Sequence, residues 1–511
     1  MILLVHHNEK VLELVDLELN QVIKNTIQNP LEALYNIANT NTSRILIWCH
    51  KSQKSNLNIE GIKQAFQLKN MMMSYCTSQY IPEQIGYVEE SPFLKVNKKV
   101  KYPTWLMSSN VGAIHASQLL KFKGLISIRN TFDFSLNSIA KIGMPKGLFC
   151  YSEPRLLNNI NVSQERRATN FELFKFVKHH YKWVWSYLLL INMMINERKF
   201  PFTSFLRTLF IRKKTPSLEF DLIPLQKNKK EQDLTIDVII PTLGRKNYLY
   251  NVLLDLSNQT ILPKQVIIVE QNDDKSSKSE LDFIENKTWP FKITHNFIHQ
   301  TGACNARNLA LQKVTANYVY LADDDNEFGC HLLENIINKM QCYNFDVITM
   351  SYLQKKEKEM HKSPLQWSTF GGGSSVVSSK YLKKIAFNMA LEFGYGEDSD
   401  FGMQLRNLGA DVIYTPDINI LHLKAPIGGF RTKFLHPWDA DTIQPKPSPT
   451  VMYYRIKNTT KEQLLGYRTN LFLQFYKSQD IKNPFKYFRN YKKQWKSSEV
   501  WANTLKNNIK V

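Results

Sequence analysis

Three consecutive aspartates, Asp323 to Asp325, directly follow the apolar run 318 to 322 in the stretch NYVYLADDDNEF. A short continuous apolar run is typical of a strand that is covered on both faces. In open α/β sheets, ligands bind beyond the carboxyl ends of the strands. Carboxylates this close together repel one another unless a cation neutralises them, and Mg²⁺ or Mn²⁺ would do so while also holding diphosphate oxygens. The stretch indicates a metal site with a phosphorylated ligand or, alternatively, a solvated acidic turn that caps a helix.

The sequence around the aspartates alternates between strand-like and helix-like segments. The strand-like segments are TIDVIIPT, QVIIVEQ, KITHNFIH and NYVYLADDD, and a helical pattern separates each from the next. Such alternation is typical of βαβ units and a mostly parallel sheet. We therefore expect an α/β fold from residue 235 to about residue 433.

Composition and charge narrow the functional classes. The chain has 511 residues, of which 43% are hydrophobic and 12% aromatic, so it can bury two to four domain cores. Six scattered cysteines form no CxxC pair, which argues against a zinc ribbon and a disulfide framework and favours a reducing compartment. A net charge of +21 requires a partner or a surface.

The chain shows no apolar run long enough for a membrane span. Residues 184 to 195, VWSYLLLINMMI, are the nearest candidate and read as a buried helix or as an interfacial segment. The first residues, MILLVHHNEKVLELVD, are too charged for a signal peptide. These features predict a cytoplasmic protein, with peripheral attachment to the inner face of the plasma membrane as a further expectation.

Four segments are expected along the chain. Residues 1 to 165 read as an N-terminal α/β domain of unknown role, and residues 166 to 232 as a helical connector that ends in the charged linker LQKNKKEQD. The α/β segment 235 to 433 follows. Residues 434 to 511 form a basic, aromatic extension with a helical character.

Several motifs in the α/β segment occur in a telling order. The first expected strand and its turn have the sequence DVIIPTLGRKNY. The helix before the aspartates is preceded by GACNARN, and the aspartates are followed by GYGEDSDFGMQLRNLG. Together with the aspartates, these pieces resemble the family 2 glycosyltransferases of GT-A fold over about 200 residues.

The resemblance implies a donor site at the strand ends. Asp325 would be the principal ligand of Mn²⁺ or Mg²⁺, with Asp323 near the metal or the ribose and His422 as a further ligand. The nucleotide pocket would be formed by Pro241, Thr242, Arg245, Glu270, Gln271, Arg307, Asp323 and Asp324. The family usually has aspartates where this chain has Glu270 and Gln271, so the choice between a UDP-sugar and a GDP-sugar stays open.

The resemblance also implies where the acceptor is activated. Asp398 would be the catalytic base and Glu397 a contact to the acceptor, although two acids at a helix start are also explained by capping and the helix dipole. The glycine run GGGSSVVSS, residues 371 to 379, would lie beside donor and acceptor or form a flexible loop. Lys424 and Arg431 would hold phosphate oxygens when their segment closes over the donor.

The basic extension and the net charge of the chain suggest a binding partner. In NPFKYFRNYKKQWKSSEVW, residues 483 to 501, aromatic and basic side chains interleave, which suits an anionic membrane surface, RNA, or a helix docked on the catalytic domain. We expect no nucleic acid, because the strand ends are acidic.

The expected function is a metal-dependent inverting transfer of a sugar from a nucleotide-diphosphate donor to a glycan or lipid-linked glycan hydroxyl, in cell-surface polysaccharide synthesis. A sugar nucleotidyltransferase fits less well, because PTLGRKNY lacks its glycine-rich loop. A catalytically silent scaffold or binding protein of a polysaccharide-assembly complex is the alternative.

Overall fold

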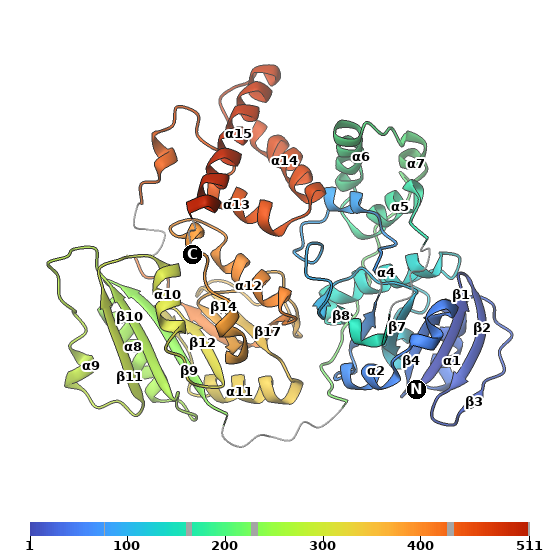
Figure 1. The fold of residues 1–511 in the computed structure, drawn as a ribbon, viewed down its shortest axis with the longest axis horizontal. Coiled ribbons are helices and arrows are strands. Elements are labelled where there is room, and N and C mark those ends of the chain that lie inside the picture. Colours follow the sequence, from blue (N-terminus) through green and yellow to red (C-terminus); the bar gives the residue numbers. More distant parts are fainter. Residues whose placement is uncertain (76, 160–165, 226–233, 427–433, 509–511) are drawn as a thin grey trace. The chain divides into compact units, whose positions relative to one another are not determined.

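The computed structural model describes residues 1–75, 77–159, 166–225, 234–426 and 434–508. The chain divides into two compact units (Figure 1). Unit 1 comprises Met1–Lys227 with Thr459–Gln474, and unit 2 comprises Asn228–Asn458 with Phe475–Val511. This division does not test the four expected segments one by one, so their limits stay predictions.

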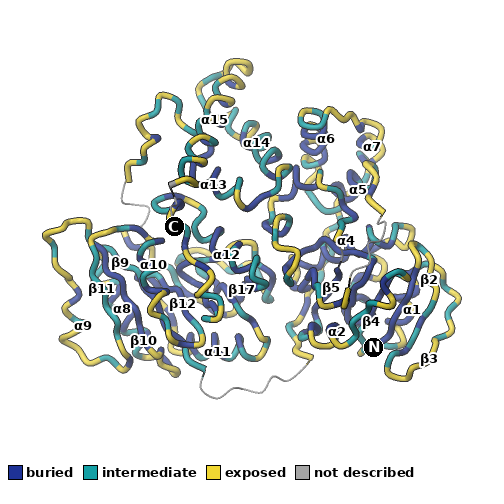
Figure 2. Tube along the Cα trace, in the orientation of Figure 1, coloured by how far each residue is buried: buried dark blue, intermediate teal, exposed yellow. Residues whose placement is uncertain are grey.

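Unit 1 is an α/β domain built on a mixed sheet. Its strands lie in the order β3-β2-β1-β4-β7-β5-β8-β6, with β1/β4 and β5/β8 paired in parallel and the other neighbours antiparallel. The strands are β1 (Ile2–His7), β2 (Lys10–Asp16), β3 (Gln21–Val22), β4 (Ile45–His50), β5 (Met71–Ser74), β6 (Tyr102–Pro103), β7 (Val111–His115) and β8 (Phe149–Ser152). The central strands are buried along most of their length, which their apolar runs require (Figure 2).

The helices of unit 1 come from two distant parts of the chain. They are α1 (Pro30–Thr40), α2 (Ile59–Ala65), α3 (Ala116–Leu120), α4 (Phe132–Gly143), α5 (Asn170–His180), α6 (Val184–Glu197), α7 (Phe202–Arg207) and most of α14 (Lys461–Tyr476). Helix α14 is tied to this unit by Gln463, whose side-chain amide donates to the carbonyl oxygens of Glu89 and Ser91, both at 2.9 Å. Part of the C-terminal extension thus belongs to the first core.

Unit 2 contains the sheet that carries the aspartates. Its strands are β9 (Ile236–Leu243), β10 (Gln265–Gln271), β11 (Lys292–Ile298), β12 (Tyr318–Ala322), β13 (Asn326–Glu327), β14 (Val347–Leu353), β15 (Leu365–Gln366), β16 (Ser374–Ser378) and β17 (Val412–His422). They lie in the order β11-β10-β9-β12-β16-β14-β17-β13, and β15 pairs with β17. The α/β class is confirmed for this segment.

The sheet of unit 2 is mixed, whereas the sequence predicted a mostly parallel one. Strands β11, β10, β9 and β12 are parallel neighbours, as expected from the βαβ pattern. Strand β16, however, lies antiparallel between β12 and β14, with Ala322 opposite Ser374. A strand as short as SSVVS carries no sequence signal of its direction. Its reversal brings the start of β16 to the edge where β12 ends.

Unit 2 also contains helices, and two of them follow the last strand of the sheet in the chain. They are α8 (Lys246–Ser257), α9 (Phe283–Asn286), α10 (Ala303–Leu311), α11 (Leu332–Tyr343), α12 (Glu397–Asn407), α13 (Pro449–Asn458) and α15 (Pro484–Asn508). Helix α12 is fixed to α13 by the fully buried Asp400, which pairs with Lys457 at 2.8 Å and accepts from Asn458 at 2.8 Å.

Helix α15 turns one aromatic face inward. Tyr487, Tyr491 and Trp495 are buried at intervals of four residues, which is the period of one helix face. These aromatics of the basic extension are therefore used in packing within unit 2. Among the described helices, none is long and apolar enough to cross a membrane.

Candidate active site

The three consecutive aspartates point in different directions and have different partners. Asp324 is buried, and both of its carboxylate oxygens are taken by protein donors, Thr242 Oγ1 at 2.7 Å and Arg245 Nη1 at 2.6 Å. Burial raises the pKa of Asp324 to about 6, against the lowering effect of Arg245. Asp324 therefore fastens the end of β12 to the turn that links β9 with α8.

Asp325 lies beside the end of β17. Its Oδ2 accepts the N–H of Ala425 at 2.8 Å and lies 3.6 Å from Nε2 of His422, the last residue of that strand. Arg245 approaches the same oxygen at 3.4 Å. Burial would raise the pKa of Asp325, but His422, the Ala425 N–H and Arg245 together bring it below the ordinary value. Asp325 is therefore a carboxylate at neutral pH.

Asp323 is the most exposed of the three aspartates. Its side chain is 28% exposed, against 3% for Asp324 and Asp325, so it is the one that faces the solvent side of the strand end. It accepts hydrogen bonds from Arg307 Nη2 at 3.1 Å and from the Tyr352 hydroxyl at 3.2 Å. The ring of Tyr352 stacks on His422 with centroids 4.5 Å apart.

Arg307 connects the aspartates to the acid pair at the start of α12. It lies on α10, and its side chain is 9% exposed. Its Nη2 contacts Asp323, while its Nη1 lies 3.7 Å from Oδ1 of Asp398. Burial would lower the pKa of Arg307, but the charges of Asp398 and Asp323 raise it. One buried guanidinium therefore holds together carboxylates from two separate elements.

The backbone of the glycine run packs against two of these carboxylates, those of Asp323 and Asp398. The Gly372 N–H donates to Asp398 Oδ2 at 2.9 Å. A Cβ at Gly372 would lie 2.4 Å from Asp398 Oδ1, and one at Gly373 would lie 2.1 Å from Asp323 Oδ2. Only glycine permits the backbone to pass this close to both carboxylates. The run is therefore packed against the site.

Asp398 has one buried oxygen, Oδ1, that accepts no hydrogen bond in the described residues and faces Arg307 at 3.7 Å. Its Oδ2 accepts from Gly372. Its side chain is 33% exposed. Desolvation raises the pKa of Asp398, and the charge of Arg307 opposes the shift. A partly desolvated carboxylate with one such oxygen is suited to accept a proton.

Glu397 is the neighbour of Asp398 at the first turn of α12. Desolvation, followed by repulsion from Asp398, raises the pKa of Glu397 to about 7. The helix begins after Gly396, whose φ of 111° places it in the region that favours glycine. Of the two acids, Asp398 is the one that contacts the glycine run, through the Gly372 N–H.

The side chains at the end of β10 are engaged with protein groups. Glu270 accepts from Ser279 Oγ at 2.5 Å and from the Glu280 N–H at 3.0 Å, and it pairs with His295 at 2.9 Å. Burial would raise the pKa of Glu270, but the bonds to His295 and Ser279 lower it. Gln271 donates to the carbonyl oxygen of Gly302 at 2.8 Å, so both side chains at this strand end bind neighbouring loops of the protein.

Two residues at the site carried no recognisable sequence signal. Glu392 accepts the N–H groups of Cys304 at 3.0 Å and Asn305 at 2.8 Å, and so occupies the N-terminus of α10. Tyr352, at the end of β14, donates to Asp323 and stacks its ring on that of His422. A lone glutamate and a strand tyrosine look ordinary in sequence, because only the fold brings them to this edge.

For the remaining predicted residues, no side-chain contact with the aspartates is described. Pro241 lies within β9, opposite Val269 of β10, so it contributes backbone to the strand end. Lys424 follows β17 with φ 58°, beside the backbone that holds Asp325. Arg431 lies outside the described residues.

The residues fit a divalent cation in part. Within the described ranges, no three His, Cys, Asp or Glu side chains form a metal-binding group, so Asp323 does not join Asp325 and His422 in one cluster. Asp325 and His422 do present an oxygen and a nitrogen 3.6 Å apart. Two ligands at about 2.1 Å from one ion lie roughly 3 to 4 Å apart, so this pair fits and would need further oxygens from a ligand or water.

Comparison with known proteins identifies the segment that carries this site. Residues 237–403 match the family model described as Glycosyl transferase family 2. The chain is 28% identical to the minor teichoic acid biosynthesis protein GgaB of Bacillus subtilis over 112 residues, which are 22% of this chain and 12% of that protein.

Two further proteins are similar. The chain is 28% identical to glycosyltransferase GlyA of Streptococcus pneumoniae over 127 residues, covering 25% of this chain and 18% of that protein. The match to the crystal structure of S. aureus TarS 1–349 in complex with UDP-GlcNAc has a TM-score of 0.37 at 17% identity, covering 50% of this chain and 79% of that one. The chain thus spans less than a fifth of the length of each of these two curated relatives.

The glycine run provides a first prediction. Gly373→Ala forces a methyl group against Asp323 and should destabilise unit 2 by about 1–3 kcal/mol, as overpacking does. Gly329→Ala is the matched control, because a Cβ at this position would meet no atom within 4 Å and the change should be nearly neutral. Scanning calorimetry of both variants measures the difference. Equal melting temperatures for the two variants would contradict the described packing.

Glu397 provides a pH-dependent prediction. Its pKa rises from 4.5 to about 7 on folding, so the folded state keeps a proton that the unfolded chain releases, and stability falls as pH rises through this window. Glu397→Gln removes that loss. Relative to wild type, the variant should gain melting temperature at about pH 8 but not below pH 4.5.

The control for this experiment is Glu285→Gln, at an exposed glutamate of α9. It should change the melting temperature by the same small amount at both pH values. If Glu397→Gln behaves like this control, the carboxyl of Glu397 is not held in the environment described.

Proposed function

We propose that this chain, whose residues 237–403 form a family 2 glycosyltransferase domain, transfers a sugar from a nucleotide-diphosphate donor to a hydroxyl of a glycan or lipid-linked glycan, with inversion at the anomeric carbon. The observation that carries the proposal is the arrangement around Arg307, which holds a carboxylate of the strand end and a carboxylate of the α12 start on one cation. Donor and acceptor groups would thereby be placed side by side.

The donor end of the site lies at the ends of β9, β10 and β12. Thr242 and Arg245 are fixed by Asp324, and Glu270 and Gln271 fix the neighbouring loops, so the pocket walls are set before a nucleotide binds. Asp325 and His422 would hold Mn²⁺ or Mg²⁺. When bound, such an ion would stabilise the negative charge of the departing nucleoside diphosphate. UDP-sugars and GDP-sugars are both candidate donors.

Asp398 is the proposed catalytic base. Its Oδ1, which accepts no hydrogen bond in the described residues, would accept the proton of the acceptor hydroxyl as the acceptor oxygen bonds to the anomeric carbon and the bond to the diphosphate oxygen breaks. Arg307 would keep Asp398 deprotonated despite desolvation. Glu397 would contact the acceptor. A single displacement of this kind needs one base and forms no covalent enzyme intermediate, which accords with inversion.

The biological setting is proposed on the same footing. The name of the Bacillus subtilis relative refers to teichoic acid biosynthesis, which is a cell-surface polymer pathway. We place this chain in cell-surface polysaccharide synthesis on that similarity, together with the site.

Nucleotide binding tests the proposal. We expect one of UDP or GDP, with Mn²⁺ present, to raise the melting temperature of the purified chain, because a ligand at 100 times its Kd adds about 2.7 kcal/mol to folding stability. Asp325→Ala should remove the metal-dependent part of the shift. Asp417→Ala, which removes an exposed carboxylate of β17, is the control and should leave the shift unchanged.

The nucleotide that binds determines which nucleotide-sugar is used in the activity assay. The corresponding nucleotide-sugar should be consumed in the presence of a glycan acceptor, and Asp398→Asn should lower kcat by about 10²-fold or more without removing nucleotide binding. A chain that binds no nucleotide would contradict the proposal and favour a silent scaffold of a polysaccharide-assembly complex.

A further inference from the structure

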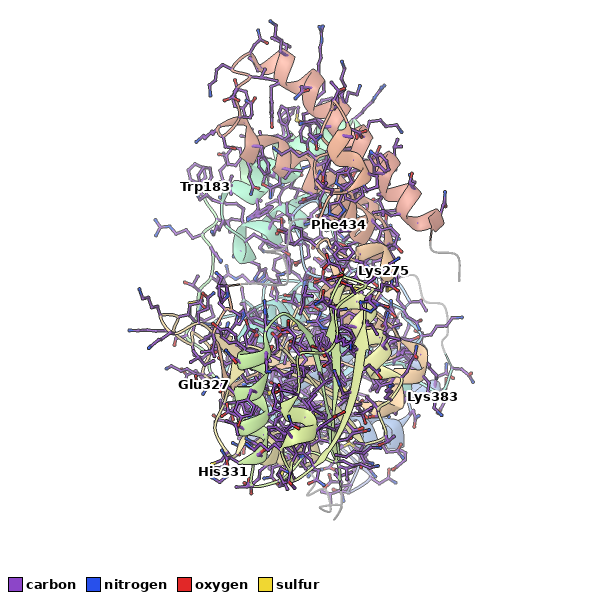
Figure 3. All side chains as sticks on the ribbon, turned by 90° about the vertical axis from the view of Figure 1, so that its left-hand side faces the viewer. Trp183, Lys275, Glu327, His331, Lys383 and Phe434 are labelled. Atoms are coloured by element: carbon purple, nitrogen blue, oxygen red, sulfur yellow. The ribbon has the colours of Figure 1, made fainter. Side chains whose placement is uncertain are left out.

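An exposed apolar surface lies on helices α6 and α7 of unit 1, far in sequence from the catalytic segment. Phe210 is 94% exposed and Trp183 is 66% exposed, and Trp183 points outward from its ribbon (Figure 3). We call the exposed large apolar side chains of this region the α6–α7 face; they are Trp183, Val184, Tyr187, Ile191, Ile195, Phe200, Phe202, Leu206 and Phe210. So many such side chains within 28 residues of sequence form a patch that needs a partner.

The face is a second apolar side of a helix whose first side is already packed. In α6, Leu189, Leu190 and Met193 are buried in the core of unit 1. Asn192 is fully buried and its Oδ1 accepts from Thr469 of α14 at 2.7 Å. One side of α6 is therefore packed against the rest of unit 1. Tyr187, Ile191 and Ile195 recur every four residues on the opposite side of the helix.

Ring contacts join the two helices into one surface. Trp183 meets Tyr187 edge to face at 5.6 Å, and Tyr187 meets Phe205 of α7 at 4.9 Å. Phe200, on the connecting segment, stacks on Phe202 at the start of α7, with ring centroids 6.2 Å apart. Helices α6 and α7 accordingly lie side by side in unit 1 (Figure 1). The apolar side chains are presented by a rigid helical pair.

Basic side chains flank this surface along the sequence. Between residues 182 and 214 the only acid is Glu197, whereas the cations are Lys182, Arg198, Lys199, Arg207, Arg212, Lys213 and Lys214. All of these cations except Lys214 are exposed. Exposed cations that neighbour Trp, Tyr and Phe side chains in sequence are complementary to a surface that is anionic outside and apolar beneath.

We propose that the α6–α7 face binds the surface of an anionic lipid bilayer and inserts its aromatic and aliphatic side chains among the headgroups. Tryptophan and tyrosine settle at the membrane interface, and each nearby Lys or Arg adds attraction to anionic lipid. A protein partner suits the composition less well, because lysine is depleted in protein interfaces. Nucleic acid suits it less well too, because Ile191, Ile195 and Leu206 offer no ring for a base to stack on.

This surface is distinct from the basic C-terminal helix. In α15, the aromatics Tyr487, Tyr491 and Trp495 are buried in unit 2, which leaves Phe485 and Phe488 as its exposed rings. The α6–α7 face also contains none of the residues assigned to sugar transfer. The inference therefore stands whether or not the proposed reaction is correct.

Vesicle co-sedimentation of the full chain tests the inference. The purified protein should bind vesicles of phosphatidylcholine mixed with phosphatidylglycerol far more strongly than vesicles of phosphatidylcholine alone, and added salt should weaken the binding. The triple variant Trp183→Ser, Ile195→Ser, Phe210→Ser should lose about tenfold or more in the partition coefficient. The charge reversal Arg212→Glu, Lys213→Glu should lose a similar factor, roughly tenfold.

Matched controls keep the result specific to this face. Leu19→Ser with Val22→Ser removes two exposed apolar side chains elsewhere in unit 1, and Lys98→Glu with Lys99→Glu reverses two exposed charges there. Both control variants should bind the vesicles like wild type. Unchanged melting temperatures would show that every variant is folded, since all the altered side chains are exposed.

Three outcomes would overturn the inference. The wild-type chain could fail to bind anionic vesicles. It could bind them equally well after the triple substitution, and lose binding instead with Phe485→Ser and Phe488→Ser on α15. Light scattering could also show self-association that the triple substitution abolishes without any lipid binding, in which case a second copy of the chain covers the face.

Discussion

The candidate site depends on one buried guanidinium. Arg307 is the cation that lies between Asp323, at the end of β12, and Asp398, at the start of α12. Without it, two partly desolvated carboxylates and the adjacent Glu397 would repel one another, and their pKa values would rise until protons were taken up. The glycine run reinforces the same constraint, because only a backbone without side chains fits against both carboxylates. The positions of the two carboxylates are therefore determined both by the charge of Arg307 and by the close packing of the glycine backbone.

Repulsion among three successive aspartates is relieved by giving each one a separate environment. Asp324 turns inward to Thr242 and Arg245, Asp325 turns to the end of β17, and Asp323 faces Arg307. The protein thus supplies a cation or a set of donors to each carboxylate before any ligand is present. This explains why the triplet is stable at a strand end, and why Asp324 is fully engaged by protein donors whereas Asp323 keeps a partly exposed side chain.

Much of the fold could be predicted from local pattern, and the rest depended on contacts between distant segments. The apolar runs predicted β9, β10 and β12, because burial on both faces leaves a clear signal, and they placed acids at the ends of β10 and β12. The antiparallel insertion of β16 left none. Nor could sequence show that Glu392 occupies the N-terminus of α10, or that α14 joins unit 1 through Gln463.

The helix at residues 184 to 197 shows the same limit. Its apolar composition was compatible with a buried helix or an interfacial one. One side is buried, as at Leu189, whereas the other is exposed, as at Ile195 with 64%. Composition does not distinguish the two sides, because both are apolar. Only the packing of α14 behind the helix reveals which side is left for a partner.

A double-mutant cycle around Arg307 tests the central claim most directly. Replacing the buried cation with Arg307→Met leaves its carboxylates unpaired and should cost about 3–5 kcal/mol of unfolding free energy. In a background carrying Asp323→Asn and Asp398→Asn, the same replacement should cost at least about 1 kcal/mol less, because no charges remain to be compensated. Equal costs in the two backgrounds would contradict the account, since Arg307 would then act through packing alone.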